Sequence, residues 1–244
     1  MNAYGLTDIG KVRTQNQDSI FFSVEPVGML PNVLIVSDGM GGHKAGEVAS
    51  QKSIEFFRSF VQAKSYVPDE LLDFLVSAVN YANEKVYEMS LQDSSLYGMG
   101  ATFSACVVYG TKIYIAHIGD SRVYFADHGR ITQLTNDHSF VNELVRAGQI
   151  TEAAARNHPR KNELLRVLGV EAHGKIDGIV YEADNDGFLL LCTDGLTNML
   201  TDDEILSIIQ GTDSLKMKTR CLISAANKNG GHDNISAVLA DLRR

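Results

Sequence analysis

Residues 102–126 have the sequence TFSACVVYGTKIYIAHIGDSRVYFA, in which short turns separate three apolar runs. The runs are rich in β-branched and aromatic residues, which is typical of strands, and Gly110-Thr111 between the first two is typical of a hairpin turn. A second turn follows at residues 127–130, Asp-His-Gly-Arg. Strands joined by such short turns pair antiparallel. The stretch therefore predicts an antiparallel meander.

The regions on either side of this meander predict further strands and four helices. Apolar runs bounded by Gly, Asp or Asn predict strands at Val33–Val36, Phe188–Cys192 and Ile235–Leu239. Apolar spacing and capping patterns predict helices at Ala45–Val61, Pro68–Met89, Thr201–Gln210, which a capping box at Thr201–Glu204 opens, and about Ser214–Asn227. Because helices and strands do not alternate strictly, we expect an α+β fold in one domain, residues 1–244, with antiparallel sheets covered by helices.

The composition excludes several classes of protein. A net charge of -8 and the lack of any Lys/Arg block argue against a nucleic-acid partner. No stretch approaches the roughly 20 apolar residues that a membrane helix needs. Cys106, Cys192 and Cys221 have no paired spacing, and the N-terminus has no apolar signal segment. These features predict reduced thiols and a cytoplasmic location without a membrane partner.

Aspartates stand at the boundaries of five apolar segments. They are Asp18, Asp38, Asp120, Asp194 and Asp233. A single Asp-Gly at a strand end is ordinarily a turn, but five converging carboxylates would need a cation to neutralise them. Oxygen ligands select hard ions, which means Mg²⁺ or Mn²⁺, with Ca²⁺ as a competitor. The sequence alone leaves open whether the strand ends converge.

The chain resembles bacterial metal-dependent protein phosphatases of the type 2C (PPM) family. The matching motifs, in the order and spacing of the family, are Thr7–Asp18, Asp38–His43 with Ala45–Ser50, Gly98–Thr102, Ile118–Arg122, Cys192–Gly195 and His232–Ser236. Each is a weak signal alone, and together they are specific and extend over nearly the whole chain. The resemblance implies a four-layer α-β-β-α sandwich of two mainly antiparallel sheets flanked by helices. It also implies a small flap subdomain at approximately residues 136–169.

The resemblance also implies a site with two Mn²⁺ or Mg²⁺ ions. By resemblance, Asp38 bridges the two ions and the Gly39 carbonyl binds one of them, while Asp194 and Asp233 complete the protein ligands of the other. Two such ions lower the pKa of a bridging water and screen the phosphate charge, so that this water or hydroxide attacks the phosphomonoester directly. No covalent phosphoenzyme is implied.

Three supporting roles follow from the same resemblance. Asp18 orders metal-bound water within or next to the ligand shell, and Asp120 together with Asp194 matches the third metal position of the family. Arg13 matches its phosphate-binding arginine. A guanidinium can hold two phosphate oxygens in a fork, which lysine cannot do.

Two positions depart from the pattern of the family. Gln17 stands where many relatives have an acid, so one ion is expected to have fewer carboxylate ligands. Met40 stands where eukaryotic members place a histidine general acid. His43, three residues further on, cannot be assumed to replace that histidine, which leaves metal-bound water as the candidate proton donor. Both departures are common in bacterial members, so we still expect activity.

The implied function is a serine/threonine protein phosphatase that acts on phosphorylated proteins. The resemblance makes a cognate serine/threonine kinase its opponent and a monomer its default state. The alternative is a regulatory or scaffold domain with the same fold and no turnover. Loss of Asp38, Asp194 or Asp233 would have supported that alternative, and all three are present. A structural Ca²⁺-binding protein would be expected to have a contiguous EF-hand-like loop, which the sequence lacks.

Overall fold

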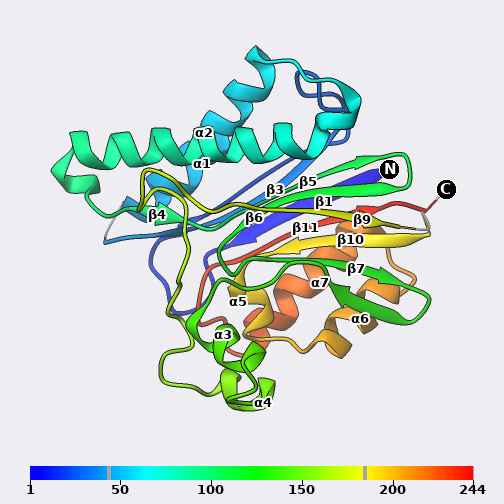
Figure 1. Ribbon diagram of the computed structural model, residues 1–244. Helices are drawn as coiled ribbons and strands as arrows, with labels where there is room; N and C mark the ends of the chain where they lie inside the picture. Colours follow the sequence, from blue (N-terminus) through cyan, green and yellow to red (C-terminus); the bar gives the residue numbers. More distant parts are fainter. Residues whose placement is uncertain (43–44, 184–185, 244) are drawn as a thin grey trace.

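The computed structural model describes residues 1–42, 45–183 and 186–243, which form two packed sheets with helices on their outer faces (Figure 1). One sheet has the order β1-β11-β10-β7-β8, and the other has the order β2-β3-β5-β6-β9 with β4 paired to β3. Every pairing is antiparallel. The expected α+β fold with antiparallel sheets and the four-layer arrangement are therefore confirmed.

The first sheet is built from strands at both ends and in the middle of the chain. Its strands are β1 (Asn2–Asp8), β7 (Arg122–Asp127), β8 (Arg130–Gln133), β10 (Gly187–Cys192) and β11 (Ile235–Asp241). The second sheet contains β2 (Asp18–Ser23), β3 (Val33–Met40), β4 (Gly100–Ala101), β5 (Phe103–Tyr109), β6 (Lys112–Ile118) and β9 (Asp177–Glu182). The predicted meander is thus β5, β6 and β7, but β7 crosses into the other sheet.

Two groups of helices cover the sandwich (Figure 1). The second sheet is covered by α1 (Ala45–Ala63) and α2 (Leu71–Gln92), with the short helices η1 (Pro68–Glu70) and η2 (Ser94–Leu96) at the ends of α2. The first sheet is covered by α5 (Asp194–Thr197), α6 (Asp202–Gln210) and α7 (Leu215–Lys228). The predicted helix Pro68–Met89 is thus divided into η1 and α2. The capping box that opens α6 is present, with Thr201 and Glu204 each bonded to the other's backbone.

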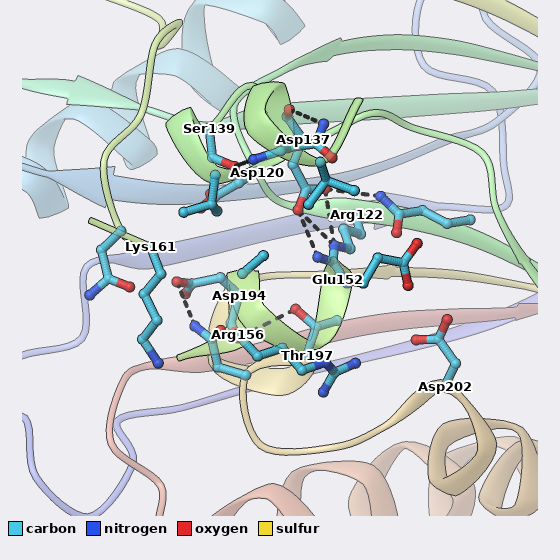
Figure 2. A pocket seen from close by; sticks show the side chains of 17 residues that line it. Asp120, Arg122, Asp137, Ser139, Glu152, Arg156, Lys161, Asp194, Thr197 and Asp202 are labelled. Atoms are coloured by element: carbon cyan, nitrogen blue, oxygen red, sulfur yellow. Dashed lines mark hydrogen bonds and ion pairs between the residues drawn. The ribbon is translucent and has the colours of Figure 1, made fainter. Parts of the chain in front are cut away.

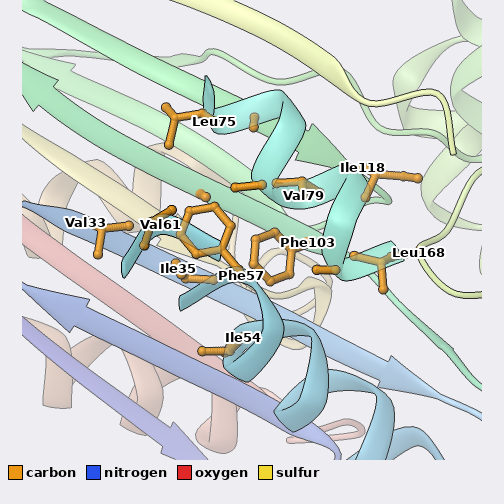
Figure 3. Close-up of a cluster of buried hydrophobic side chains, with 14 of the residues drawn as sticks. Val33, Ile35, Ile54, Phe57, Val61, Leu75, Val79, Phe103, Ile118 and Leu168 are labelled. Atoms are coloured by element: carbon orange, nitrogen blue, oxygen red, sulfur yellow. The ribbon is translucent and has the colours of Figure 1, made fainter. Parts of the chain in front are cut away.

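Three apolar clusters hold the layers together. One lies between the two sheets, one between the second sheet and α1 and α2, and one between the first sheet and α5 to α7. Figure 3 shows the second of these, where Phe57 of α1 meets Phe103 of β5 with ring centroids 5.6 Å apart. Burying one such side chain contributes about 1.5–3 kcal/mol, so the clusters fix the strands on which the site depends.

The inner strands have apolar side chains on both faces. In β10, Leu189 and Leu191 belong to the cluster between the sheets, while Leu190 and Cys192 belong to the cluster under the helices. A strand buried on both faces has an unbroken apolar run instead of an alternating one. This explains why these strands stand out in the sequence.

Residues 136–169 lie outside both sheets, beside the ends of the strands (Figure 1). They contain α3 (Phe140–Arg146) and α4 (Glu152–Arg156). The entrance and exit of the segment are joined, since the Leu165 N–H donates to the His138 carbonyl at 2.8 Å and Ser139 forms a bridge with Leu164. The segment therefore leaves the sandwich and returns to it at nearly the same place. Among the described residues, no helix has the length and apolar character needed to span a bilayer.

Candidate active site

The structure brings the five predicted aspartates together at one end of the sandwich. Asp18 on β2 lies directly opposite Asp38 on β3 in the antiparallel ladder. The charges of four aspartates all act on Asp38 and raise its pKa; they are Asp18, Asp194, Asp120 and Asp233. Asp194 follows β10 and Asp233 precedes β11, two strands of the first sheet, while Asp38 lies on the second, so the cluster draws on the ends of both sheets. The strand ends therefore converge.

Burial and mutual repulsion disfavour ionisation of this cluster. Burial raises the pKa of Asp38 well above its usual value, and the neighbouring carboxylates raise it further. Burial also raises the pKa of Asp18 to about 7, against hydrogen bonds that lower it. The pKa of Asp194 rises to about 6, through burial first and the charge of Asp233 second. A cation would remove this penalty, because an opposite charge favours the ionised form.

Hydroxyls from the first sheet hold Asp18 in place. The Thr193 and Ser236 hydroxyls donate to Oδ2 of Asp18, at 2.8 Å and 2.7 Å. Asp18 is 6% exposed, and its other oxygen, Oδ1, is buried and has no hydrogen-bond partner among the described residues. A buried carboxylate oxygen without a donor is costly unless another group binds it. Sequence reasoning missed Thr193 and Ser236, although each stands within three residues of a predicted aspartate.

Asp194 shows the same pattern at the start of α5. Asn198 donates to Oδ2 of Asp194 at 2.9 Å, while Oδ1 of Asp194 is buried and none of the residues that the structure describes bonds to it. The next residue must be glycine, because a Cβ on Gly195 would lie 1.9 Å from the carbonyl oxygen of Asn234. The Asp194 turn and the start of β11 are therefore packed against each other, which places Asp194 beside Asp233.

The backbone around Gly39 is equally close-packed. A Cβ on Gly39 would lie 1.9 Å from the Gly46 carbonyl at the start of α1, so the position requires glycine. The Gly39 N–H donates to the Gln17 carbonyl at 3.1 Å, and the Thr102 hydroxyl accepts from the Asp38 N–H at 2.9 Å. These contacts fix the backbone that presents the Gly39 carbonyl and the Asp38 carboxylate.

Arg13 lies at the exposed rim of the cluster. Its guanidinium donates to Oδ2 of Asp233 at 2.8 Å, and the side chains are 52% and 32% exposed. An ion pair in water is worth about 0–1 kcal/mol, so Arg13 can exchange Asp233 for another anion at little cost. The structure thus places Arg13 next to the aspartates, as its motif predicts.

Asp120 faces a pocket of about 300 Å³ between residues 136–169 and α5. Figure 2 shows Asp120 and Asp137 across this pocket from Asp194 and Thr197. The guanidinium of Arg122 neutralises Asp137, and its Nη2 donates to Oδ2 of Asp137 at 2.7 Å. Burial and the charge of Asp194 raise the pKa of Asp120 well above its usual value. Neither the pocket nor the Arg122–Asp137 pair is apparent from the sequence.

The donor set fits hard divalent ions. The cluster offers oxygens only, and two of these, on Asp18 and Asp194, are buried without a partner in the part of the chain that the structure describes. Carboxylate and carbonyl oxygens suit Mg²⁺ and Mn²⁺. In the described ranges 1–42, 45–183 and 186–243, no three His, Cys, Asp or Glu side chains already enclose a point where an ion could be held. The aspartates thus border the site without already enclosing it.

The two departures from the family pattern also have a place in the structure. Gln17 contributes its carbonyl to the Gly39 N–H and the Ser50 hydroxyl, and its side-chain amide donates to the Gly41 carbonyl at 3.5 Å. Met40 is 39% exposed and offers no titratable group. His43, the other residue considered at this position, lies outside the described residues.

Comparisons with known proteins agree with one another. The family described as Protein phosphatase 2C matches residues 11–240. Serine/threonine phosphatase stp of Listeria welshimeri is 37% identical over 248 aligned residues, which cover 99% of this chain and 96% of that protein. The crystal structure of serine/threonine phosphatase Stp1 from Staphylococcus aureus matches with a TM-score of 0.93 at 32% identity, over 99% of this chain and 95% of that one. The catalytic domain of the phosphatase PstP, in complex with two manganese ions, matches with a TM-score of 0.85 at 34% identity, over 100% and 98%.

Proposed function

Because the chain belongs to the Protein phosphatase 2C family, we propose which of its residues catalyse the hydrolysis of phosphoserine and phosphothreonine on proteins. It is a serine/threonine protein phosphatase that uses Mn²⁺ or Mg²⁺, and the alternative of a scaffold without turnover is not supported. The ion ligands would be Asp18, Asp38, the Gly39 carbonyl, Asp120, Asp194 and Asp233. The observation that supports this assignment best is the convergence of five aspartates from both sheets beside an exposed arginine.

Bound Mn²⁺ or Mg²⁺ would activate a water as the nucleophile and screen the charge of the phosphate. The protein positions the ligands for these ions. The charge of Asp194 acts on Asp38, so the two carboxylates are close enough to face one ion. The hydroxyls on Oδ2 of Asp18 hold this carboxylate in place, which leaves Oδ1 available for an ion. Met40 has no proton to give, so it cannot protonate the leaving serine or threonine oxygen.

Arg13 would bind the phosphate itself. Its guanidinium lies at the rim of the cluster, on a loop that faces solvent. When substrate arrives, the fork can move from Asp233 to two phosphate oxygens, which carry more charge than one carboxylate. That exchange would also free Asp233 to bind an ion. Arg13 would thus act in substrate binding before the transition state is reached.

Replacing Arg13 with alanine should raise KM for p-nitrophenyl phosphate by roughly 10- to 100-fold, with a smaller change in kcat, because a bidentate charge-assisted contact is lost. The KM of Arg13→Lys should lie between those of the natural protein and Arg13→Ala, since lysine keeps the charge but cannot bind two phosphate oxygens at once. Lys11→Ala is the matched control, because its side chain lies exposed on the same loop. An unchanged KM in Arg13→Ala would refute the assignment.

Asp120→Ala should slow turnover by roughly 10- to 100-fold while the two tightly held ions remain bound. Asp120 faces the pocket side of the cluster, where it would serve the third ion only. Titration calorimetry with Mn²⁺ would count the tight sites, and steady-state assays would give the rate. Loss of tight binding would contradict a separate third position. Glu152→Ala, in the same pocket, is the control and should leave hydrolysis of a small substrate unchanged.

Further proposals concern the setting in which the enzyme acts. Its substrates are phosphorylated proteins, and we propose that a serine/threonine kinase supplies them. We propose that residues 136–169 form a flap subdomain within a single domain, residues 1–244. We also propose a monomer in a reducing, cytoplasmic compartment, which the three free cysteines support. Light scattering on the purified protein would test the monomer.

A further inference from the structure

Asn234 links the aspartate cluster to the loop that bears Arg13. We call residues 9–17 the Arg13 loop. The side-chain amide of Asn234 donates to two carbonyls of this loop, that of Ile9 at 3.0 Å and that of Gln15 at 2.9 Å. Its side-chain oxygen accepts from the Gln17 N–H at 2.8 Å. The side chain of Asn234 therefore hydrogen-bonds to the loop on both sides of Arg13.

The backbone of Asn234 is fixed by its surroundings. The residue is 5% exposed, and its carbonyl packs against Gly195, where even one extra Cβ would lie 1.9 Å away. Asn234 also directly follows Asp233, and its N–H donates to Oδ1 of that carboxylate at 2.8 Å. The side chain thus reaches the loop from a rigid position beside Asp194 and Asp233.

The Arg13 loop has little other support around the arginine. It contains no helix or strand, and residues 11–15 are exposed. Among the described residues, the bonds nearest to Arg13 are its own to Asp233, the Lys11 N–H to the Gly231 carbonyl, and the Gln15 carbonyl to Asn234. Without Asn234, the Gln15 carbonyl would lose its bond to the sandwich, and the next fixed points after Arg13 would be Asn16, bonded to Thr7, and Gln17, bonded to Gly39 and Ser50.

We propose that Asn234 is a positioning residue for phosphate binding, which closes the Arg13 loop at both ends and so holds the guanidinium beside the aspartates. This inference rests on the proposed role of Arg13. The geometry requires two donors and one acceptor on one short planar group, and only asparagine provides them at this length. A fixed loop loses less conformational freedom when the phosphate binds, which lowers KM.

Asn234→Asp tests the clamp with an isosteric side chain. It keeps an oxygen for the Gln17 N–H but places a carboxylate oxygen against the carbonyls of Ile9 and Gln15. We expect KM for p-nitrophenyl phosphate to rise about tenfold, with kcat changed less than about threefold, because the lost bonds act on substrate binding. The inhibition constant of inorganic phosphate should rise by the same factor. Asn234→Ala should behave likewise.

A double-mutant cycle with Arg13→Ala separates positioning from general damage. If Asn234 acts through Arg13, Asn234→Asp in the Arg13→Ala background should change KM less than about twofold. Independent, multiplicative effects on KM would overturn the inference and leave the role of Arg13 intact. An unchanged KM in Arg13→Ala alone would overturn both.

Two controls complete the test. Asn229→Asp alters the same connection to β11 and should leave KM unchanged, because the side-chain amide of Asn229 donates to the Met199 carbonyl, away from the Arg13 loop. The Mn²⁺ concentration for half-maximal activity reports on Asp233, the neighbour of Asn234. A shift of that concentration in Asn234→Asp with an unchanged KM would show that Asn234 supports the ion site and would overturn the inference.

Discussion

Asp38→Ala is expected to lower kcat/KM by at least about a thousandfold, because it removes the carboxylate that lies among four others. A thousandfold loss corresponds to roughly 4 kcal/mol of transition-state stabilisation, which is the scale of an ion's electrostatic contribution. Asp38 stands opposite Asp18 in the ladder and within reach of Asp194, so no neighbour can take its place between them. The same loss is expected for Asp194→Ala and Asp233→Ala.

The fold should survive these substitutions, and this separates a catalytic effect from unfolding. Without divalent ions, Asp38→Ala should even raise the melting temperature, because one of several repelling buried carboxylates is gone. Asp213→Ala, at an exposed aspartate before α7, is the matched control and should leave both activity and stability unchanged. Full activity in all three cluster variants would show that the ions are held elsewhere.

The sequence predicts the inner strands well and the edge strands poorly, for a physical reason. The run at Gly187–Cys192 is buried throughout, and the runs at Phe103–Tyr109 and Lys112–Ile118 are mostly buried, so all three are largely apolar. The four edge strands, β1, β8, β2 and β9, have no neighbour on one side and are partly exposed. Of these, the sequence analysis indicated only the turn before β8 and the boundary at Asp18. It could not show that β7 pairs with β10 instead of β6.

The candidate site likewise has a part that the sequence predicts and a part that it does not. The five aspartates can be found in the sequence because they stand at the ends of apolar strands, and the family motifs suggest their roles. The groups that hydrogen-bond to these aspartates, however, lie far from them in the sequence. Asp18 is separated by 175 residues from Thr193 and by 218 from Ser236. Asn234 hydrogen-bonds to the Arg13 loop, and the nearest of its partners in the sequence, Gln17, is 217 positions away. Such contacts depend on how the two sheets pack, which local patterns do not determine.

A second large effect is expected on stability when ions are removed. In chelator-treated protein, stability should fall as pH rises from about 4 to 7, because burial raises the pKa of Asp18 from 3.8 to about 7. Below pH 4 the carboxyl is protonated in both the folded and the unfolded state. Between the two pKa values the unfolded chain releases its proton while the folded protein retains it, so unfolding becomes more favourable with rising pH. Above pH 7 the penalty is constant, at roughly 4 kcal/mol.

Asp18→Asn isolates this effect, because an amide oxygen can still accept the Thr193 and Ser236 hydroxyls while the charge is gone. Urea unfolding in chelator should give similar stabilities for the two proteins near pH 4 and a more stable variant at pH 8. Carboxylates elsewhere with lowered pKa, such as Asp177, are shared by both proteins and cancel in the difference. Adding Mn²⁺ at pH 8 should stabilise the natural protein more than the variant, since the ion binds only the folded state. Parallel pH profiles for the two proteins would mean that Asp18 is not the group whose charge the ion neutralises, and the ligand set would then have to be built from Asp38, Asp194 and Asp233 without it.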